Sequence, residues 1–285
     1  MRRWRRTGAS RWLLLAPAVA LVTVFVLLPL GVAGLDSAQS FGDWTTSNYA
    51  DVLLRPPYAA ILRNTMAVAA LTTGFTMLLA VPAAAFLAPR AGAAASAVLG
   101  LLAATLWLSI LVKCYAWQIV LARNGPLNAL LLGLGVTGRP LDLLYTRGAV
   151  VVAMVQAMVP SACILLVAGM RRIDWDVIIA ARTLGARLPR VAIEVYWPQI
   201  RYSVVMTTLV IFVGASSFFV APALLGGPTD TMVGTKMQSD LINQYDSGLA
   251  ATQGVLLTLI LLALAGFAVL LAGRPYHRRA TEARR

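Results

Sequence analysis

Few residues of this sequence are of a type that does nucleophilic, acid–base or metal chemistry. The chain has a single histidine, His277 near its C-terminal end, and two cysteines, Cys114 and Cys163, without a CxxC spacing or a nearby histidine. This set predicts no metal site, no disulfide framework and no catalytic residue. The phosphate-binding pattern GxxxxGK[ST] is also missing from the sequence. We therefore predict that the chain needs no cofactor and does not itself hydrolyse ATP.

The long apolar stretches of the chain have no Asp or Glu in their middle. Ionisable residues inside a membrane usually mark ion or proton relays, so this pattern disfavours an ion-coupled secondary carrier, which is the main alternative function. A membrane-embedded enzyme would need converging His, Cys or carboxylate groups and is disfavoured too. Candidate residues for a solute path are the polar and aromatic side chains of these stretches: Tyr115, Trp117, Gln156, Ser216, Phe218 and Phe219. The alternative roles are aromatic anchoring at the membrane interface and hydroxyl bonding between helices.

The segment 171–200 has a different pattern. Asp174 is a suitable N-cap, and an apolar stripe at helical spacing follows it. Gly185 can adopt the left-handed conformation that ends a helix. Pro189 then suits the first turn of a second short helix, which we expect to stop before Pro198. The pattern predicts a helix, a sharp turn and another helix.

Two interpretations of this helical hairpin remain open on the residues alone. Ala180 and Ala181 leave the middle of the first helix nearly bare, so that the groove of another protein can close around it. Alternatively, the helix rests on lipid head groups as an interfacial amphipathic helix.

The elements that must position these residues are membrane-spanning helices. Of the 285 residues, 59% are hydrophobic and 12% are charged, against roughly 25% charged in soluble domains, so much of the surface is expected to face lipid. A span needs about 20 apolar residues. Six segments qualify: 12–34, 59–88, 93–117, 149–170, 202–221 and 249–272. The third and sixth are the clearest, and we expect kinks at Pro82 in the second and Pro160 in the fourth.

Arginine and lysine positions set the orientation of these spans. With the N-terminus inside, 17 of the 24 Lys and Arg residues lie on the cytoplasmic side and 7 on the outer side, as the positive-inside rule requires. The segment 1–11 is then a basic cytoplasmic N-terminus and 273–285 a basic cytoplasmic tail. A cleaved signal peptide is the alternative for the N-terminus, but its apolar run is longer than a signal sequence needs. Nucleic-acid binding has no support beyond the net charge of +13.

The hairpin segment resembles the loop motif of binding-protein-dependent ABC importer permeases. That motif reads Glu-Ala-Ala, three residues, Gly, nine residues, an aliphatic residue, one residue, Leu, Pro. Ile179 replaces the usual Glu and Trp197 the usual Leu. In the family this loop is the coupling helix that sits in a cleft of the ATPase subunit, and the interface here would be anchored by Trp175 and Ile179. The resemblance implies an ATPase-coupling set made up of Asp174, Trp175, Ile179, Ala180, Ala181, Leu184, Gly185 and Pro198.

Further stretches narrow the resemblance to the first permease of spermidine/putrescine-type systems: 111–117 followed by 124–128, then 140–146 and 218–227. The implied fold is all-α and integral to the membrane, with six spans, both ends inside, a permease domain at 59–272 and the coupling helix between spans four and five. The implied partners are two copies of an ABC ATPase, a second related permease and a periplasmic substrate-binding protein. The implied place is the bacterial inner membrane, and the implied cargo is a polyamine or a similar cationic or zwitterionic compound.

Overall fold

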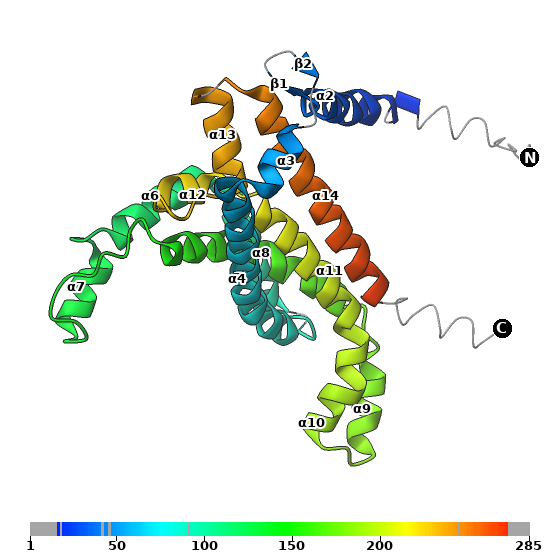
Figure 1. The fold of residues 1–285 in the computed structure, drawn as a ribbon. Helices are drawn as coiled ribbons and strands as arrows, with labels where there is room; N and C mark the ends of the chain where they lie inside the picture. Colours follow the sequence, from blue (N-terminus) through cyan, green and yellow to red (C-terminus); the bar gives the residue numbers. More distant parts are fainter. Residues whose placement is uncertain are drawn as a thin grey trace, which may run out of the picture. The chain divides into compact units, whose positions relative to one another are not determined.

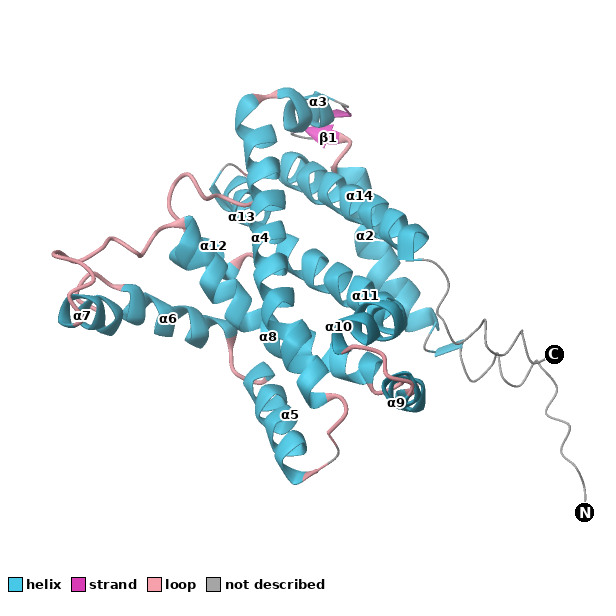
Figure 2. Cartoon of the chain, turned by 90° about the horizontal axis from the view of Figure 1, so that it is seen from below, coloured by secondary structure: helices cyan, strands magenta, loops and turns pink. Residues whose placement is uncertain are grey.

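The computed structural model describes residues 16–272, except 18, 41–42, 45–46, 91 and 244, and for 40, 43, 271 and 272 it describes the backbone alone. The predicted basic segments 1–11 and 273–285, with His277, and the first residues of the predicted first span lie outside this part. Nearly all of the described chain is helical, and its two strands, of two residues each, form one hairpin (Figure 2). The expectation of an all-α fold is confirmed.

The chain divides into two compact units. The first consists of the described residues up to Ala59 together with Lys236–Thr258, and the second of Ala60–Thr235 together with the described residues from Leu259 on. Three helices, α4 (Pro56–Leu87), α13 (Val233–Asn243) and α14 (Ser247–Ala272), run from one unit into the other.

The first unit begins with an apolar helix that includes η1 (Thr23–Leu27) and α2 (Leu28–Asp36). The hairpin of β1 (Gln39–Ser40) and β2 (Asp43–Trp44) and the helix α3 (Ser47–Leu54) follow. Thr252 of α14 donates a hydrogen bond to the Ser37 carbonyl at 2.9 Å. A Cβ on Gly248 would lie 1.9 Å from the Gln39 carbonyl oxygen. Glycine at this position therefore lets the start of α14 approach the chain that follows α2.

The second unit is built around α8 (Arg147–Met170), half of whose residues are buried. It packs against α5 (Ala93–Leu106), α6 (Ile110–Leu121), α11 (Trp197–Ser216) and α12 (Val220–Leu225). The remaining elements of this unit are α7 (Pro126–Gly133), α9 (Trp175–Thr183), α10 (Leu188–Val191) and η2 (Ala192–Tyr196). Figure 1 shows that α9 and α10 project beyond the end of α11 as a hairpin.

The structure supports most of the predicted spans in position. Five described helices are long and apolar enough to cross a membrane, or six if the bent pair Ala93–Leu106 and Ile110–Gly133 counts as one span. The predicted spans 59–88, 149–170 and 249–272 correspond to α4, α8 and α14. Exposed leucine and phenylalanine side chains cover much of α4 and α14, as expected of surfaces that face lipid or another membrane protein.

The third predicted span, 93–117, is not one straight helix. Its first half, α5, meets the helical segment Ile110–Gly133, which begins with α6, at 94° across a break at Trp107–Ser109. Ser109 has φ −54° and ψ 134°, which is extended backbone and cannot continue a helix. The fifth predicted span, 202–221, is interrupted as well, because α11 ends at Ser216 and α12 starts at Val220. Two further helices, α7 and α13, lie in the connections between predicted spans.

Candidate functional site

The helix α9 has both of the ends that its sequence predicts. The Asp174 carboxylate accepts a hydrogen bond from the Asp176 backbone N–H at 3.1 Å, which satisfies one of the free donors at the helix start. Asp176 lies in the first turn and Arg182 in the last. Each of these charges is opposite in sign to the partial charge of the nearby helix end, which stabilises the helix.

Gly185 ends α9 with φ +85°. The Gly185 N–H donates to the Arg182 carbonyl at 3.0 Å, and the Ala186 N–H donates to the Ala181 carbonyl at 3.1 Å. This pair of bonds is a Schellman motif, in which the residue after the C-cap takes the left-handed conformation that glycine adopts without steric cost. The sharp turn of the hairpin is therefore fixed by the backbone.

The second arm of the hairpin does not stop before Pro198, so that expectation was wrong. From Leu188 the chain stays helical through α10 and η2 into α11, and Pro198 is in the first turn of α11. The Trp197 N–H donates to the Ala192 carbonyl, five residues back. Proline has no N–H to bond the carbonyl four residues earlier, and the wider π turn before it lets the helix continue.

The residues of the predicted coupling set divide between the interior and the surface of the hairpin. The Trp175 ring lies 6.0 Å from the ring of Tyr196, so Trp175 joins the two arms. Ile179 is 60% exposed and Leu184, at the turn, is 88% exposed. Ala180 is exposed, while Ala181 and Pro198 are half-buried. The Asp174 N–H donates to the Gln199 side chain at 3.3 Å.

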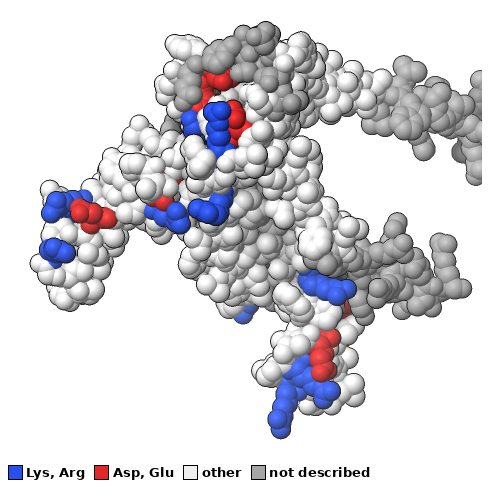
Figure 3. Space-filling view, viewed as in Figure 1, with Lys and Arg blue, Asp and Glu red and all other residues white. Residues whose placement is uncertain are grey.

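An open hollow of about 760 Å³ lies between the arms of the hairpin. Its walls are small or apolar at Ala181, Leu184 and Val191, and charged at Arg187, Arg190 and Glu194. Arg190 pairs with Glu194 at 2.9 Å. Lys and Arg side chains gather at the far end of the hairpin (Figure 3). The tip thus offers apolar side chains surrounded by positive charge.

The predicted path residues do not form one site in this chain. Phe218 and Phe219 line an open hollow of about 640 Å³ where the two helix breaks meet the middle of α8. Ser216 is fully buried and donates to the Phe212 carbonyl at 2.8 Å. Tyr115 and Gln156 are exposed, and Trp117 packs against the core. The hollow has further lining residues that the proposed path set missed: Trp107, Ser109, Lys113, Ser161 and Ser217.

The amino-acid composition of an apolar stretch does not show where a helix breaks inside it. The hollow could therefore not have been predicted from the sequence. Non-helical backbone at membrane depth is tolerated where it lines a cavity or is buried in protein. Within the described part of the chain, no group of three or more His, Cys, Asp or Glu side chains could hold a metal ion.

The fold is that of the permeases of ABC importers. A bacterial ABC transporter involved in the import of the acidic polysaccharide alginate matches with a TM-score of 0.75 and 17% identity over 93% of this chain and 96% of that chain. The MetNI methionine ABC transporter matches with a TM-score of 0.58 and 15% identity over 77% of this chain and 98% of that chain. Identities this low establish the fold alone.

Curated relatives make the likeness more specific. The chain is 27% identical over 264 residues to the spermidine/putrescine transport system permease protein PotB of Salmonella typhimurium (strain SL1344), covering 90% of this chain and 92% of that protein. It is 28% identical over 218 residues to PotB of Escherichia coli K12, covering 76% of this chain and 79% of that protein. No protein-family model matches the chain. The resemblance to spermidine/putrescine-type permeases is thus confirmed, and the chain is a multi-pass membrane protein with an importer permease fold.

Proposed function

We propose that this chain is one permease subunit of an ATP-driven importer in the bacterial inner membrane. It forms the solute path together with a second, related permease. Two copies of a separate ATPase subunit supply the energy, and a periplasmic binding protein delivers the solute. The relatives named above and the shared fold support this assignment.

The observation that carries the proposal is the capped hairpin of α9 and α10. It projects from the second unit with an exposed Leu184 at its turn and an exposed Ile179 on α9. Ala180, Ala181 and Gly185 match the importer loop motif and Ile179 stands at its Glu position; in that family the loop sits in a cleft of the ATPase subunit. An exposed apolar tip is costly in water, and a groove on another subunit would cover it.

The mechanism that fits this arrangement is alternating access. Closure of two ATPase subunits on ATP would draw the docked hairpins of the two permeases together and open the spans toward the loaded binding protein. The Trp175–Tyr196 contact and the continuous helix from Leu188 to Ser216 connect the hairpin to a membrane span. A rigid connection of this kind can transmit a displacement of the hairpin to α11.

The proposed cargo is a small amine, namely a polyamine or a similar cationic or zwitterionic compound. The PotB relatives are permeases of spermidine/putrescine transport systems, which supports this class. Aromatic side chains such as Phe218 and Phe219 attract ammonium groups by about 0.5–2 kcal/mol each, and both line the hollow at the helix breaks.

The proposal is tested by reconstituting the permease pair, the ATPase and the binding protein into proteoliposomes. We expect uptake of radiolabelled putrescine or spermidine that requires ATP and the binding protein. Gly185→Trp should reduce cargo-stimulated ATP hydrolysis at least about ten-fold, because the Schellman turn needs a positive φ that tryptophan adopts only with strain. Gly74→Trp, at a position on α4 where an added Cβ meets nothing within 4 Å, is the control for added bulk. Full coupling in Gly185→Trp would contradict the docking role, and uptake without any ATPase would overturn the assignment.

A further inference from the structure

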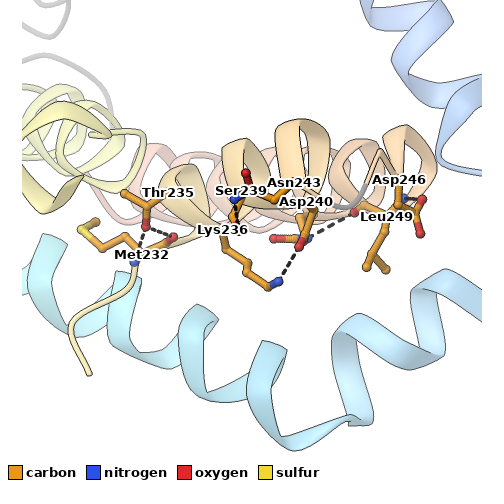
Figure 4. Close-up of polar contacts among 9 residues, drawn as sticks. Met232, Thr235, Lys236, Ser239, Asp240, Asn243, Asp246 and Leu249 are labelled. Atoms are coloured by element: carbon orange, nitrogen blue, oxygen red, sulfur yellow. Dashed lines mark hydrogen bonds and ion pairs between the residues drawn. The ribbon is translucent and has the colours of Figure 1, made fainter. Parts of the chain in front are cut away.

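A buried carboxylate in the first unit is held by an ammonium group of the chain itself. The side chain of Asp240 on α13 is completely buried, and its Oδ1 forms an ion pair with the Nζ of Lys236 one turn earlier. Its second oxygen, Oδ2, accepts a hydrogen bond from Nε2 of Gln253 on α14 at 2.6 Å. Figure 4 shows the side chains of Lys236 and Asp240 pointing toward one another.

An aromatic ring completes the surroundings of this ammonium group. Nζ of Lys236 lies 5.3 Å from the ring centroid of Tyr58, at the start of α4. Cations within about 6 Å of such a ring are attracted by its electron-rich face. A carboxylate and an aromatic face are both groups that bind a primary alkylammonium ion, and the Gln253 amide holds the carboxylate in place.

The cost of burial explains why the site is occupied. A carboxylate taken out of water without a partner is strongly unfavourable, and removal of one member of a buried ion pair typically costs about 3–5 kcal/mol. A cation at its Oδ1 therefore stabilises the buried carboxylate of Asp240. The Lys236 side chain is 17% exposed, whereas that of Asp240 is not exposed at all, so the ammonium group is the member of the pair that solvent reaches.

We propose that the Asp240 carboxylate, oriented by Gln253, and the ring of Tyr58 form a binding site for a primary ammonium group of the cargo, and that Lys236 occupies this site when no cargo is bound. The lysine side chain is itself a linear alkylammonium ion, so the end of a polyamine carries the same group that Asp240 and Tyr58 contact here. The charge distribution of the sequence assigns this cluster to the side that receives cargo. This inference rests on the proposed importer function, because it takes its ligand class from there.

The test measures direct binding of putrescine to the assembled permease–ATPase complex in lipid nanodiscs, without ATP or binding protein. Lys236→Ala removes the resident ammonium and should bind putrescine at least about ten-fold more tightly than the wild type. The double variant Lys236→Ala/Asp240→Asn should lose that gain. Arg55→Ala makes the same charge change at an exposed ion pair of the same unit, and it should bind like the wild type.

A stability measurement covers the case in which Lys236→Ala folds poorly. We expect its melting temperature to be lower than that of the wild type and to rise with added putrescine or propylamine, but not with propanol. The double variant should show no response to the amine. The proposal is overturned if Lys236→Ala binds putrescine no better than the wild type, if the gain survives Asp240→Asn, or if amine fails to stabilise the single variant. None of these results affects the ATP-dependent uptake of the wild type, which tests the importer function separately.

Discussion

At the scale of single residues, burial decides which ion pairs matter. Arg147, at the start of α8, donates from its Nε to the Asp230 carboxylate at 3.2 Å and from a terminal nitrogen to the Asn64 side-chain oxygen at 2.7 Å. Asn64 in turn donates to the Thr231 carbonyl at 3.0 Å. The Asp230 side chain is 9% exposed. This network ties α4 to the loop before α13 and leaves Asp230 dependent on one arginine.

We predict that Arg147→Met destabilises the protein by about 1–3 kcal/mol, because it leaves a buried acceptor without its donor. Arg147→Met/Asp230→Asn should recover part of the loss. The matched control is Arg123→Met, whose pair with Asp142 spans 4.0 Å with both side chains largely exposed; such pairs contribute about 0–1 kcal/mol. Thermal unfolding of the purified protein compares the three variants. Equal melting temperatures for Arg147→Met and Arg123→Met would contradict the account.

Residue environments were the least predictable part of the site. The N-cap at Asp174 and the C-terminal glycine at Gly185 follow from short-range rules, and both predictions are confirmed by hydrogen bonds. Whether a hydroxyl faces solute or backbone depends on tertiary packing. Ser216 and Ser217 both donate to carbonyls of α11. Ser216 is nevertheless fully buried whereas Ser217 lines the hollow, and no local pattern distinguishes the two.

At the scale of elements, the close approach of α8 and α11 depends on a glycine. A Cβ on Gly169 would lie 2.0 Å from Oγ and 2.7 Å from Cβ of Ser203. Small residues let transmembrane helices approach in this way. The interface that connects the core helix to the span behind the hairpin is therefore set by the Gly169–Ser203 contact.

We predict that Gly169→Ala lowers stability by about 1–3 kcal/mol through overpacking. Ser203→Gly removes both clashing atoms, so the double variant should regain most of the loss. Gly214→Ala is the control on α11, because its added Cβ would only touch Met158 at 3.7 Å. Thermal unfolding in detergent measures the three effects. A double variant as unstable as Gly169→Ala would show that the cost has another origin.

Elements were predictable where one long apolar run forms one helix. The bounds of α8 and α14 lie within two residues of those predicted, because a hydrophobic run of span length fixes them. Hydropathy did not report the break at Trp107–Ser109, since those residues suit a membrane whether or not the helix continues. Hydropathy also gave no sign of the π turn that joins α10 to α11. The turn is followed by Pro198, and a proline usually marks the end of a helix.

At the scale of the whole molecule, the proposed function requires one sidedness. The hairpin must lie on the cytoplasmic side, where the ATPase is, and the Lys236–Asp240 cluster must lie on the opposite side. The excess of arginine around the hairpin predicts this orientation, and the one predicted span between hairpin and cluster, 202–221, agrees with it.

The most direct test of the central claim is site-specific crosslinking at the tip of the hairpin. The two native cysteines, Cys114 and Cys163, are buried and can be replaced by alanine, after which Leu184→Cys introduces one exposed thiol. We predict that this thiol crosslinks to the ATPase subunit in the assembled complex. In right-side-out vesicles it should be protected from a membrane-impermeant maleimide. Labelling from outside, or no crosslink in a complex that still hydrolyses ATP in response to cargo, would contradict the account.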